Sequence, residues 1–166
     1  MPRRGLSASK VIKPVRWGVL GCARVFQKRM LPAFAASEHN SLTALASRDF
    51  AKAKSVAAAN GIPYAFGDYD ALLACADIDA VYIPLPNDIH AEYTERALLA
   101  GKHVLCEKPL AMGLAQAQAM FEAARQNGVM LLEAFPYYFQ PQTGAMLELV
   151  RGGDIGRVRS VQASFG

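Results

Sequence analysis

From Val15 onward, short apolar runs alternate with longer stretches in which apolar residues recur every three or four positions. The first pattern predicts strands and the second predicts helices. The expected strands are 15–20, 42–46, 64–66, 80–83, 104–106 and 130–132. Strands this apolar, each followed by a helix, are buried on both faces, which predicts a doubly wound parallel sheet of the α/β class.

The predicted helices carry cap and stop signals at their ends. Pro32 is expected to kink or shorten the first helix, which runs to about Ala36. Asp49 and Asp68 are expected to cap two later helices, and glycines stop three of them: Gly61, Gly101 and Gly128. The helix before Gly128 is predicted to bury a face formed by Leu114, Ala117, Phe121 and Ala124.

Residues 157–166 follow a different pattern, in which apolar and polar side chains alternate. Val161, Ala163 and Phe165 would lie on one face of a strand that is half-buried and antiparallel. Because such a strand is not stable alone, we expect the chain to end just inside a second, α+β domain that is truncated here, or a partner chain to cover the strand. This gives three predicted segments: 1–14, 15–133 and 134–166.

Composition and charge narrow the classes of partner. The 166 residues are 52% hydrophobic and 19% charged, as in a globular domain. Five of the 18 basic residues and no acidic ones lie within residues 1–16, so the remaining chain is close to neutral and no nucleic-acid partner is expected. Lys10, Lys13 and Pro14 interrupt what would be the apolar part of an export signal, so residues 1–14 are predicted to be a disordered basic tail.

No apolar run is long enough for a membrane span, so no membrane association is expected. Cys22, Cys75 and Cys106 are scattered and show no metal-ligand spacing. We therefore predict reduced thiols, no metal site and a cytoplasmic protein.

The turn after the first strand, in "WGVLGCARVF", is a candidate phosphate site. Gly21 ends the strand and free N–H groups of a helix should follow, which suits a pyrophosphate. The three positions of a G-x-G-x-x-G motif are held by Gly21, Ala23 and Phe26, so the motif is degenerate and Phe26 is bulky where helix and strand should meet. A plain strand–turn–helix connection is the alternative. The candidate residues are Gly21, Cys22, Ala23, Arg24 and Val25.

The end of the second strand favours NADP over NAD. A NAD site places an acidic residue there, on the ribose hydroxyls. This chain has Ser47 and Arg48, which can donate to a 2′-phosphate, and Asp49 is better placed as a helix cap. A solvated loop arginine is the alternative reading of Arg48.

The fourth and fifth strands end in loops that should lie at the same edge of the sheet as the glycine turn. Pro84, Leu85 and Pro86 could form an apolar wall for a nicotinamide ring, and Asn87 could cap the next helix and present its amide. His90 is a candidate cofactor contact, with a partly exposed capping or packing histidine as the alternative. After the fifth strand stand Glu107, Lys108 and Pro109. Residue types alone favour a surface Glu–Lys pair, whereas their position at a strand end favours a site.

Three segments resemble one family: "GVLGCARV", "PLPNDIHAEYTERALLAGKHVLCEKPLAM" and "GDIGRVRSVQASF" are similar to glucose–fructose oxidoreductases, inositol dehydrogenases and their relatives, the Gfo/Idh/MocA family. The resemblance implies a Rossmann domain over 15–133 and the start of a substrate domain over 134–166. It implies hydride transfer between a pyridine nucleotide and a sugar, cyclitol or related alcohol or ketone. It also places Lys108 beside the nicotinamide as the catalytic residue, with Glu107 on the cofactor side.

Two departures from the family pattern limit the transfer. Tyr138 stands where many relatives have an arginine, and Pro136 replaces a more flexible residue. Tyr137 and Tyr138 are candidate sugar contacts, with core or interdomain packing as the alternative. The second catalytic group of the family, usually a histidine on the later domain, has no counterpart in this sequence.

The sequence therefore predicts the cofactor domain of an NADP-dependent oxidoreductase that acts on a sugar or sugar nucleotide. The 166-residue chain is expected to be inactive alone, and the full-length protein is expected to form homo-oligomers. Parts of the sequence resemble sugar-nucleotide 3-ketoreductases and others resemble aldose or dihydrodiol dehydrogenases, so the substrate stays open. A non-catalytic dinucleotide-binding module or sensor is the alternative function.

Overall fold

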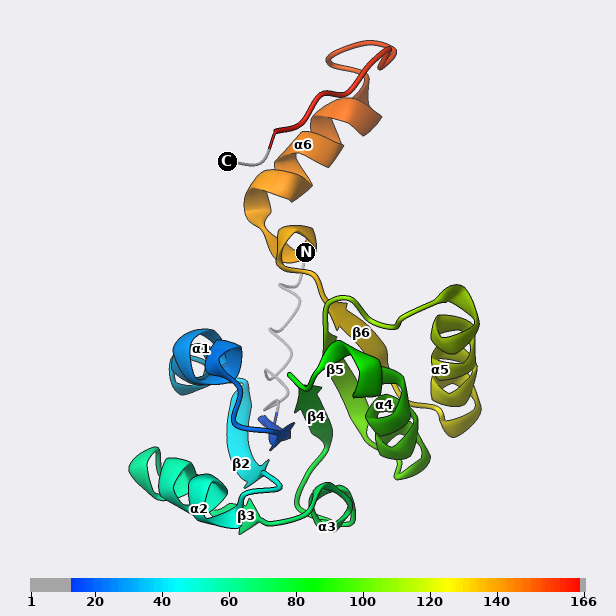
Figure 1. Ribbon diagram of the computed structural model, residues 1–166. Helices are drawn as coiled ribbons and strands as arrows, with labels where there is room; N and C mark the ends of the chain where they lie inside the picture. Colours follow the sequence, from blue (N-terminus) through cyan, green and yellow to red (C-terminus); the bar gives the residue numbers. More distant parts are fainter. Residues whose placement is uncertain (1–12, 165–166) are drawn as a thin grey trace, which may run out of the picture. The chain divides into compact units, whose positions relative to one another are not determined.

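A computed structural model describes residues 13–164, in which six strands form one sheet (Figure 1). The strands are β1 (Val15–Leu20), β2 (Asn40–Ala46), β3 (Tyr64–Phe66), β4 (Ala80–Ile83), β5 (His103–Glu107) and β6 (Leu131–Ala134). The helical elements are η1 (Phe26–Met30), α1 (Leu31–Ala35), α2 (Phe50–Ala59), α3 (Tyr69–Leu73), η2 (Asn87–Ile89), α4 (His90–Leu99), α5 (Leu114–Asn127), η3 (Pro136–Phe139) and α6 (Pro141–Gly152). The tail predicted over 1–14 lies outside the described residues, except for its last two positions.

The strand order is β3-β2-β1-β4-β5-β6, and β1 lies at the centre of the sheet. The pairs β1–β2, β1–β4, β2–β3 and β4–β5 are parallel. The chain therefore moves outward from β1 in one direction and then returns to continue from β4 in the other. In sheets of this kind, ligands bind beyond the carboxyl ends of the strands where the order reverses. The predicted doubly wound Rossmann-type fold is confirmed.

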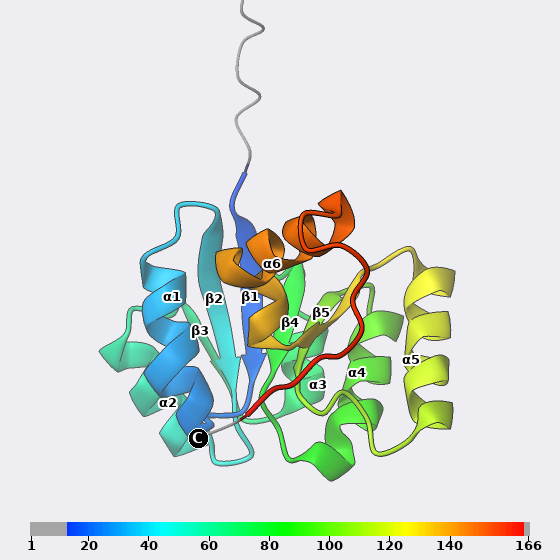
Figure 2. The same ribbon diagram turned by 90° about the horizontal axis from the view of Figure 1, so that it is seen from above.

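Two helical layers cover the sheet, with α1 and α2 on one face and α3, α4 and α5 on the other (Figures 1 and 2). Side-chain alternation along the strands supplies both layers with apolar residues. Leu20, Val81 and Cys106 belong to the cluster packed with α3, α4 and α5. Their neighbours Val19 and Tyr82 are fully buried on the opposite face. Burial on both faces explains why these strands are apolar throughout.

The segment after β1 departs most from regular helix. Leu31 donates its backbone N–H to the carbonyl of Phe26, five residues earlier, so η1 is a π-helical turn that leads into α1. Pro32 lies in the first turn of α1, where its missing N–H costs least. The helical segment continues through Pro32 and ends at Ala35, near the predicted end at Ala36, whereas a kink at Pro32 stays a prediction. Phe26 has no exposed surface, so its bulk is accommodated inside the fold.

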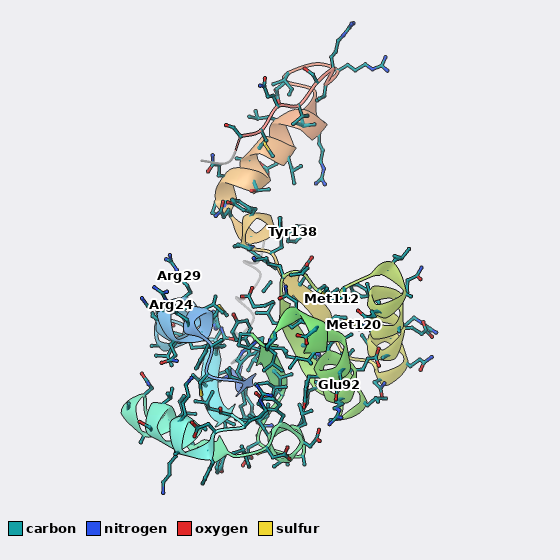
Figure 3. The ribbon with its side chains drawn as sticks, viewed as in Figure 1. Arg24, Arg29, Glu92, Met112, Met120 and Tyr138 are labelled. Atoms are coloured by element: carbon teal, nitrogen blue, oxygen red, sulfur yellow. The ribbon has the colours of Figure 1, made fainter. Side chains whose placement is uncertain are left out.

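The face predicted for α5 is partly wrong. Leu114 is 74% exposed and Phe121 is 51% exposed, whereas Met120 has no exposed surface and Ala124 is buried. Both stripes share Ala124, and Met120 lies one position, or about 100°, from Phe121 around the helix. Helical periodicity alone does not separate these two stripes. Figure 3 labels Met120 and also Met112, which precedes the helix and is 64% exposed.

The chain divides into two compact units between Glu133 and Ala134. The second unit contains η3 and α6, and α6 ends at Gly153 in the left-handed conformation. The antiparallel strand predicted after it is absent from the described residues, where positions 157–164 have no regular structure and Val161 is 85% exposed. No neighbouring strand within residues 13–164 supplies the hydrogen bonds that this segment would need.

Cys22, Cys75 and Cys106 are free thiols, as expected for a reduced protein. Across residues 13–164, no helix has the length and apolarity required to cross a membrane. The same residues contain no cluster of three His, Cys, Asp or Glu side chains that could hold a metal ion.

Candidate functional site

Four loops with predicted site residues follow the carboxyl ends of β1, β2, β4 and β5. Because these strands are parallel neighbours, the loops lie at one edge of the sheet, which we call the carboxyl edge. Gly21 follows β1, Ser47 and Arg48 follow β2, and Lys108 follows β5. The glycine turn and the lysine are therefore on the same side of the molecule, as a single cofactor site requires.

Gly21 is in a conformation that only glycine adopts readily, with φ of 100°. Its N–H donates to the carbonyl of Ala46 at 2.7 Å, which ties the turn to β2. A Cβ at this position would lie 3.0 Å from Leu85 Cδ2 and 3.8 Å from the Tyr69 hydroxyl. Gly21 thus meets two requirements at once: the backbone bend and close packing against the loop after β4.

The residues after Gly21 present backbone and positive charge at the start of η1. The Gln27 amide donates to the Cys22 carbonyl at 2.9 Å. Ala23 is half-buried, whereas Arg24 and Val25 are exposed. Figure 3 shows Arg24 and Arg29 projecting outward from this segment. The arrangement suits an anionic group, and contact with a pyrophosphate stays a prediction for Gly21–Val25.

Cys22 is buried in this turn, and burial raises the pKa of its thiol, with Lys52 and a hydrogen bond to Ser47 acting in the opposite direction. Cys106, at the end of β5, has a pKa raised by burial to about 12. Both thiols are therefore protonated at neutral pH. Neither is suited to act as a nucleophile.

Arg48 and Ser47 differ in exposure. Ser47 is 8% exposed, its hydroxyl accepts the N–H of Asp49 at 3.2 Å, and it also hydrogen-bonds the Cys22 thiol. Arg48 is exposed and hydrogen-bonds the Tyr69 hydroxyl. Asp49 caps α2 by accepting from the Lys52 N–H at 3.0 Å, as the sequence predicts. Arg48 is thus an exposed cationic group directly after β2, and its contact with a ribose 2′-phosphate stays a prediction.

Tyr69 was not among the predicted site residues. It is 6% exposed, its ring packs edge-on against Tyr93 at 5.0 Å, and its hydroxyl lies between the Gly21 turn and Arg48. Burial raises the pKa of this hydroxyl, and the nearby Arg48 opposes the shift. The capping Asp68 signals the start of α3 but not that its first residue reaches the site. Only the parallel alignment of β1, β2 and β3 brings Tyr69 there.

The loop after β4 forms a wall whose inner half is apolar. Pro84 and Leu85 are buried, whereas Pro86 and Asn87 are exposed. The predicted capping role of Asn87 is wrong, because Pro86 occupies the cap position and Asn87 begins η2 without a side-chain cap bond. Its exposed amide is still free to meet a ligand, and the wall stays a prediction for nicotinamide contact.

His90 has no exposed surface. Its Nδ1 lies 2.8 Å from the carbonyl oxygen of Pro109, and its Nε2 lies 2.8 Å from that of Leu85. Both ring nitrogens therefore face backbone carbonyls inside the protein. The prediction that His90 contacts the cofactor does not agree with this position, because a side chain without exposed surface has no face to offer a ligand. The packing role in the alternative agrees with this position, whereas the partial exposure expected there is wrong.

Lys108 stands directly after β5 with its side chain exposed. Its N–H donates to Glu107 Oε2 at 3.3 Å, and Glu107 Oε1 accepts the Tyr82 hydroxyl at 2.6 Å. Burial, then the bond to Glu107, raises the pKa of Tyr82, so this hydroxyl stays protonated and donates. Within residues 13–164 the structure gives the Lys108 ammonium no hydrogen-bond or ion-pair partner. It is free to meet a ligand.

The backbone around Lys108 is held on both sides. The peptide bond to Pro109 is cis. Beyond it, the Leu110 N–H donates to Glu133 Oε1 at 2.9 Å. Sequence reasoning missed Tyr82 and Glu133. A tyrosine within the apolar run of β4 is one available signal, since a buried hydroxyl needs a partner; Glu133 gives no comparable signal.

Tyr137 and Tyr138 belong to η3 of the second unit and are 44% and 73% exposed. The Tyr138 ring packs edge-on against Phe139 at 5.3 Å, and Tyr137 is tilted against Phe135 at 5.8 Å. Their exposure is compatible with either a ligand contact or packing, so the sugar contact stays a prediction.

Comparison with known proteins decides the family. Residues 15–135 match the GFO_IDH_MocA family, described as an oxidoreductase family with a NAD-binding Rossmann fold. The chain belongs to the Gfo/Idh/MocA family. The segment that matches contains all four loops of the carboxyl edge.

Individual members of the Gfo/Idh/MocA family are close in sequence. A dTDP-3,4-didehydro-2,6-dideoxy-alpha-D-glucose 3-reductase from Streptomyces violaceoruber is 47% identical over 157 residues, which are 95% of this chain and 46% of the relative. A D-xylose 1-dehydrogenase (NADP(+)) from Haloferax volcanii is 48% identical over 149 residues, 90% of this chain and 45% of the relative. The chain thus spans about half the length of the curated relatives it matches.

The fold agrees with solved structures of the same family. KijD10, a 3-ketoreductase from Actinomadura kijaniata whose crystal structure holds TDP-benzene and NADP, superposes with a TM-score of 0.79 at 42% identity. The match covers 85% of this chain and 44% of KijD10. A scyllo-inositol dehydrogenase from Lactobacillus casei gives the same TM-score at 28% identity.

Proposed function

We propose that this chain binds NADP at the carboxyl edge and forms the cofactor half of an oxidoreductase that acts on a sugar or sugar nucleotide. Arg48 is the observation that carries the cofactor assignment: an exposed guanidinium follows β2, and the nearby Asp49 is engaged as a helix cap. A 2′-phosphate would meet a cation there, whereas a NAD site has a carboxylate. The xylose dehydrogenase named above uses NADP, and KijD10 binds it.

The residues present fit such a cofactor along its length. Gly21–Val25 would hold the pyrophosphate, because Gly21 brings the backbone close and the helical segment begins three residues later, at Arg24. Ser47 and Arg48 would hold the ribose 2′-phosphate. The wall at Pro84–Asn87 would support the nicotinamide, and Glu107 would hold the ribose or nicotinamide side of the cofactor. When bound, the nicotinamide supplies or accepts the hydride.

Lys108 is the residue that we assign to the reacting oxygen. Its backbone is fixed through Glu107 on one side and Leu110 on the other, while its ammonium is exposed. In the reducing direction an ammonium donates a hydrogen bond and then a proton to the oxygen of the carbonyl that receives hydride. In the oxidising direction the neutral amine of Lys108 accepts the proton from the alcohol and becomes the ammonium. Substrate identity belongs to the part of the relatives that this chain does not cover.

The alternative is a dinucleotide-binding module without catalysis. It shares the cofactor contacts but requires nothing of Lys108. A chain that also carries the second half found in relatives distinguishes the two functions, because only the enzyme should turn over substrate.

The cofactor assignment is tested by titrating the 166-residue chain with NADPH and with NADH, and by comparing the wild type with Arg48→Ala. We expect NADPH affinity to fall about 10- to 100-fold and NADH affinity to change less than about twofold, since only NADPH has the 2′-phosphate. Arg125→Ala is the matched control, because Arg125 pairs with Glu122 on α5 and its loss removes one positive charge elsewhere. An equal loss for both cofactors, or no loss, would contradict the assignment.

A further inference from the structure

His90 joins two loops of the carboxyl edge that are far apart in the sequence. It is the first residue of α4, which begins beside the ends of β4 and β5 (Figure 1). One ring nitrogen faces the carbonyl of Leu85, five residues earlier, and the other faces that of Pro109, 19 residues later. Both distances are 2.8 Å, and the imidazole has no exposed surface. A single buried side chain therefore bridges the nicotinamide wall and the lysine loop.

The bridge continues to the phosphate turn. A Cβ added at Gly21 would lie 3.0 Å from Leu85 Cδ2, so the Leu85 side chain packs closely against the glycine turn. A chain of direct contacts thus runs from the glycine turn through Leu85 and His90 to Pro109, the neighbour of Lys108. The links are buried: Leu85 is 9% exposed and His90 is 0% exposed. The tautomer decides which ring nitrogen donates its N–H to the carbonyl that it faces. A buried hydrogen bond of this kind fixes a backbone more strongly than an exposed one, since a lost partner leaves a carbonyl without water to replace it.

The other contacts of the lysine loop, which contains Lys108 and Pro109, do not connect it to the wall at Pro84–Asn87. Glu107 ties Lys108 to Tyr82 of β4, and Glu133 ties Leu110 to β6. These contacts join the loop to β4 and β6, and neither involves the residues of the wall at Pro84–Asn87. His90 alone among these contacts connects the loop to the wall that packs on Gly21.

We propose that His90 is a positioning residue, which sets the distance between the Lys108 loop and the cofactor-binding wall and turn. This inference rests on the proposed function, because it concerns the same site. His90 acts through Leu85 and Pro109 and touches neither cofactor nor substrate. Its loss is expected to loosen the loop around Lys108 while the sheet stays intact.

Two variants separate positioning from general stability. His90→Phe fills a similar volume but donates no hydrogen bond, and His90→Gln keeps one N–H donor group. His103→Phe is the matched control. His103 begins β5, the strand that leads into the lysine loop, and its Nδ1 accepts the Met130 N–H at 2.9 Å. This contact lies at the amino edge, away from the loops that His90 joins. All three variants are made in the 166-residue chain.

The first readout is amide hydrogen exchange, measured by NMR without cofactor. In His90→Phe we expect the Leu110 amide, which donates to Glu133, to exchange at least about tenfold faster, with Val19 and Val81 of the central strands changed less than about twofold. His90→Gln should restore part of the protection, and His103→Phe should leave Leu110 unchanged. Wild-type exchange at Leu110 in a folded His90→Phe, or equal acceleration of loop and strands, would overturn the proposal.

The second readout is NADPH and NADH affinity. His90→Phe should weaken both cofactors by the same factor, about 3- to 10-fold, because the wall shifts but Arg48 does not. A selective loss of NADPH would contradict a positioning role for the wall. If the wild-type chain binds neither cofactor, the proposed function fails, and the exchange result then decides on His90 independently.

Discussion

The two edges of the sheet differ in whether their charged side chains have partners within the fold. At the amino edge, where β1, β4 and β5 begin, Arg16 is paired with Asp79 at 2.7 Å and Asp77 at 3.2 Å. The Lys102 ammonium is buried there and donates to the carbonyls of Cys75 and Ile78, both at 2.8 Å. At the carboxyl edge, the Lys108 ammonium has no such partner within residues 13–164.

The difference separates charges that hold the fold from charges that are available to a ligand. A surface depression at the amino edge is lined by residues that include Arg16, Asp79 and His103, yet its Arg16 and Asp79 charges are paired with each other. The carboxyl edge instead fixes backbone: Glu107, His90 and Glu133 bind the main chain of the loops. Bound backbone with a free cationic side chain is the arrangement expected of a site.

The sharpest test of this comparison is the same substitution at each edge. Lys102→Met should lower the free energy of unfolding by about 2–3 kcal/mol, because two buried carbonyls lose their donor, and should leave NADPH affinity unchanged. Lys108→Met should change unfolding by less than about 0.5 kcal/mol. In a chain that carries the second half found in relatives, it should lower turnover about 10²- to 10⁴-fold with little change in cofactor affinity.

Denaturant unfolding, cofactor titration and steady-state kinetics measure these outcomes. Turnover that survives Lys108→Met would favour the binding module over the enzyme. A stable Lys102→Met chain would mean that the amino edge does not depend on its buried cation.

Alanine substitutions at two glycines test the same comparison, with smaller expected effects than the lysine substitutions. Gly21 has φ of 100° and packs against Leu85, whereas Gly61 has φ of 65° and no atom within 4 Å of an added Cβ. Gly61→Ala should cost about 1–2 kcal/mol of stability through backbone strain and leave cofactor affinity intact. Gly21→Ala should cost about 1–3 kcal/mol and also weaken NADPH at least about tenfold, since the turn must shift away from Leu85. Equal cofactor affinities in both variants would remove Gly21 from the site.

Local signals in the sequence were sufficient for most of the sheet. The strands Val15–Leu20, Tyr64–Phe66 and Ala80–Ile83 have the predicted bounds, because each is an apolar run between polar or turn residues. The caps at Asp49 and Asp68 are also confirmed, with side chains that accept N–H groups of the first turn. These features depend on residues no more than a few positions apart, which a sequence displays directly.

The errors share a different cause, since each depends on which distant segment a residue meets. His90 was a candidate cofactor contact, but its partner Pro109 is 19 residues away and turns the imidazole inward. On α5, the choice of Met120 over Phe121 depends on where the helix lies against the sheet. The strand predicted around Val161 needed a neighbour that residues 13–164 do not supply. Lys108 was located by resemblance to a family, not by its local pattern.

The smallest predicted effect concerns pH and the amino edge. The hydrogen bonds from Arg16 hold the pKa of Asp79 below its usual range. A carboxylate with a lowered folded-state pKa stabilises the fold above its unfolded pKa of 3.8, and this contribution is lost as the pH falls through the folded value. The pair is partly exposed, with side chains 41% and 40% accessible, so Asp79→Asn should lower Tm only about 1–3 °C at pH 7. The difference from wild type should shrink toward zero as the pH falls below 3.8, whereas Glu148→Gln on the second unit should match wild type at each pH. A Tm difference that is independent of pH would show that Asp79 contributes through its shape and not its charge.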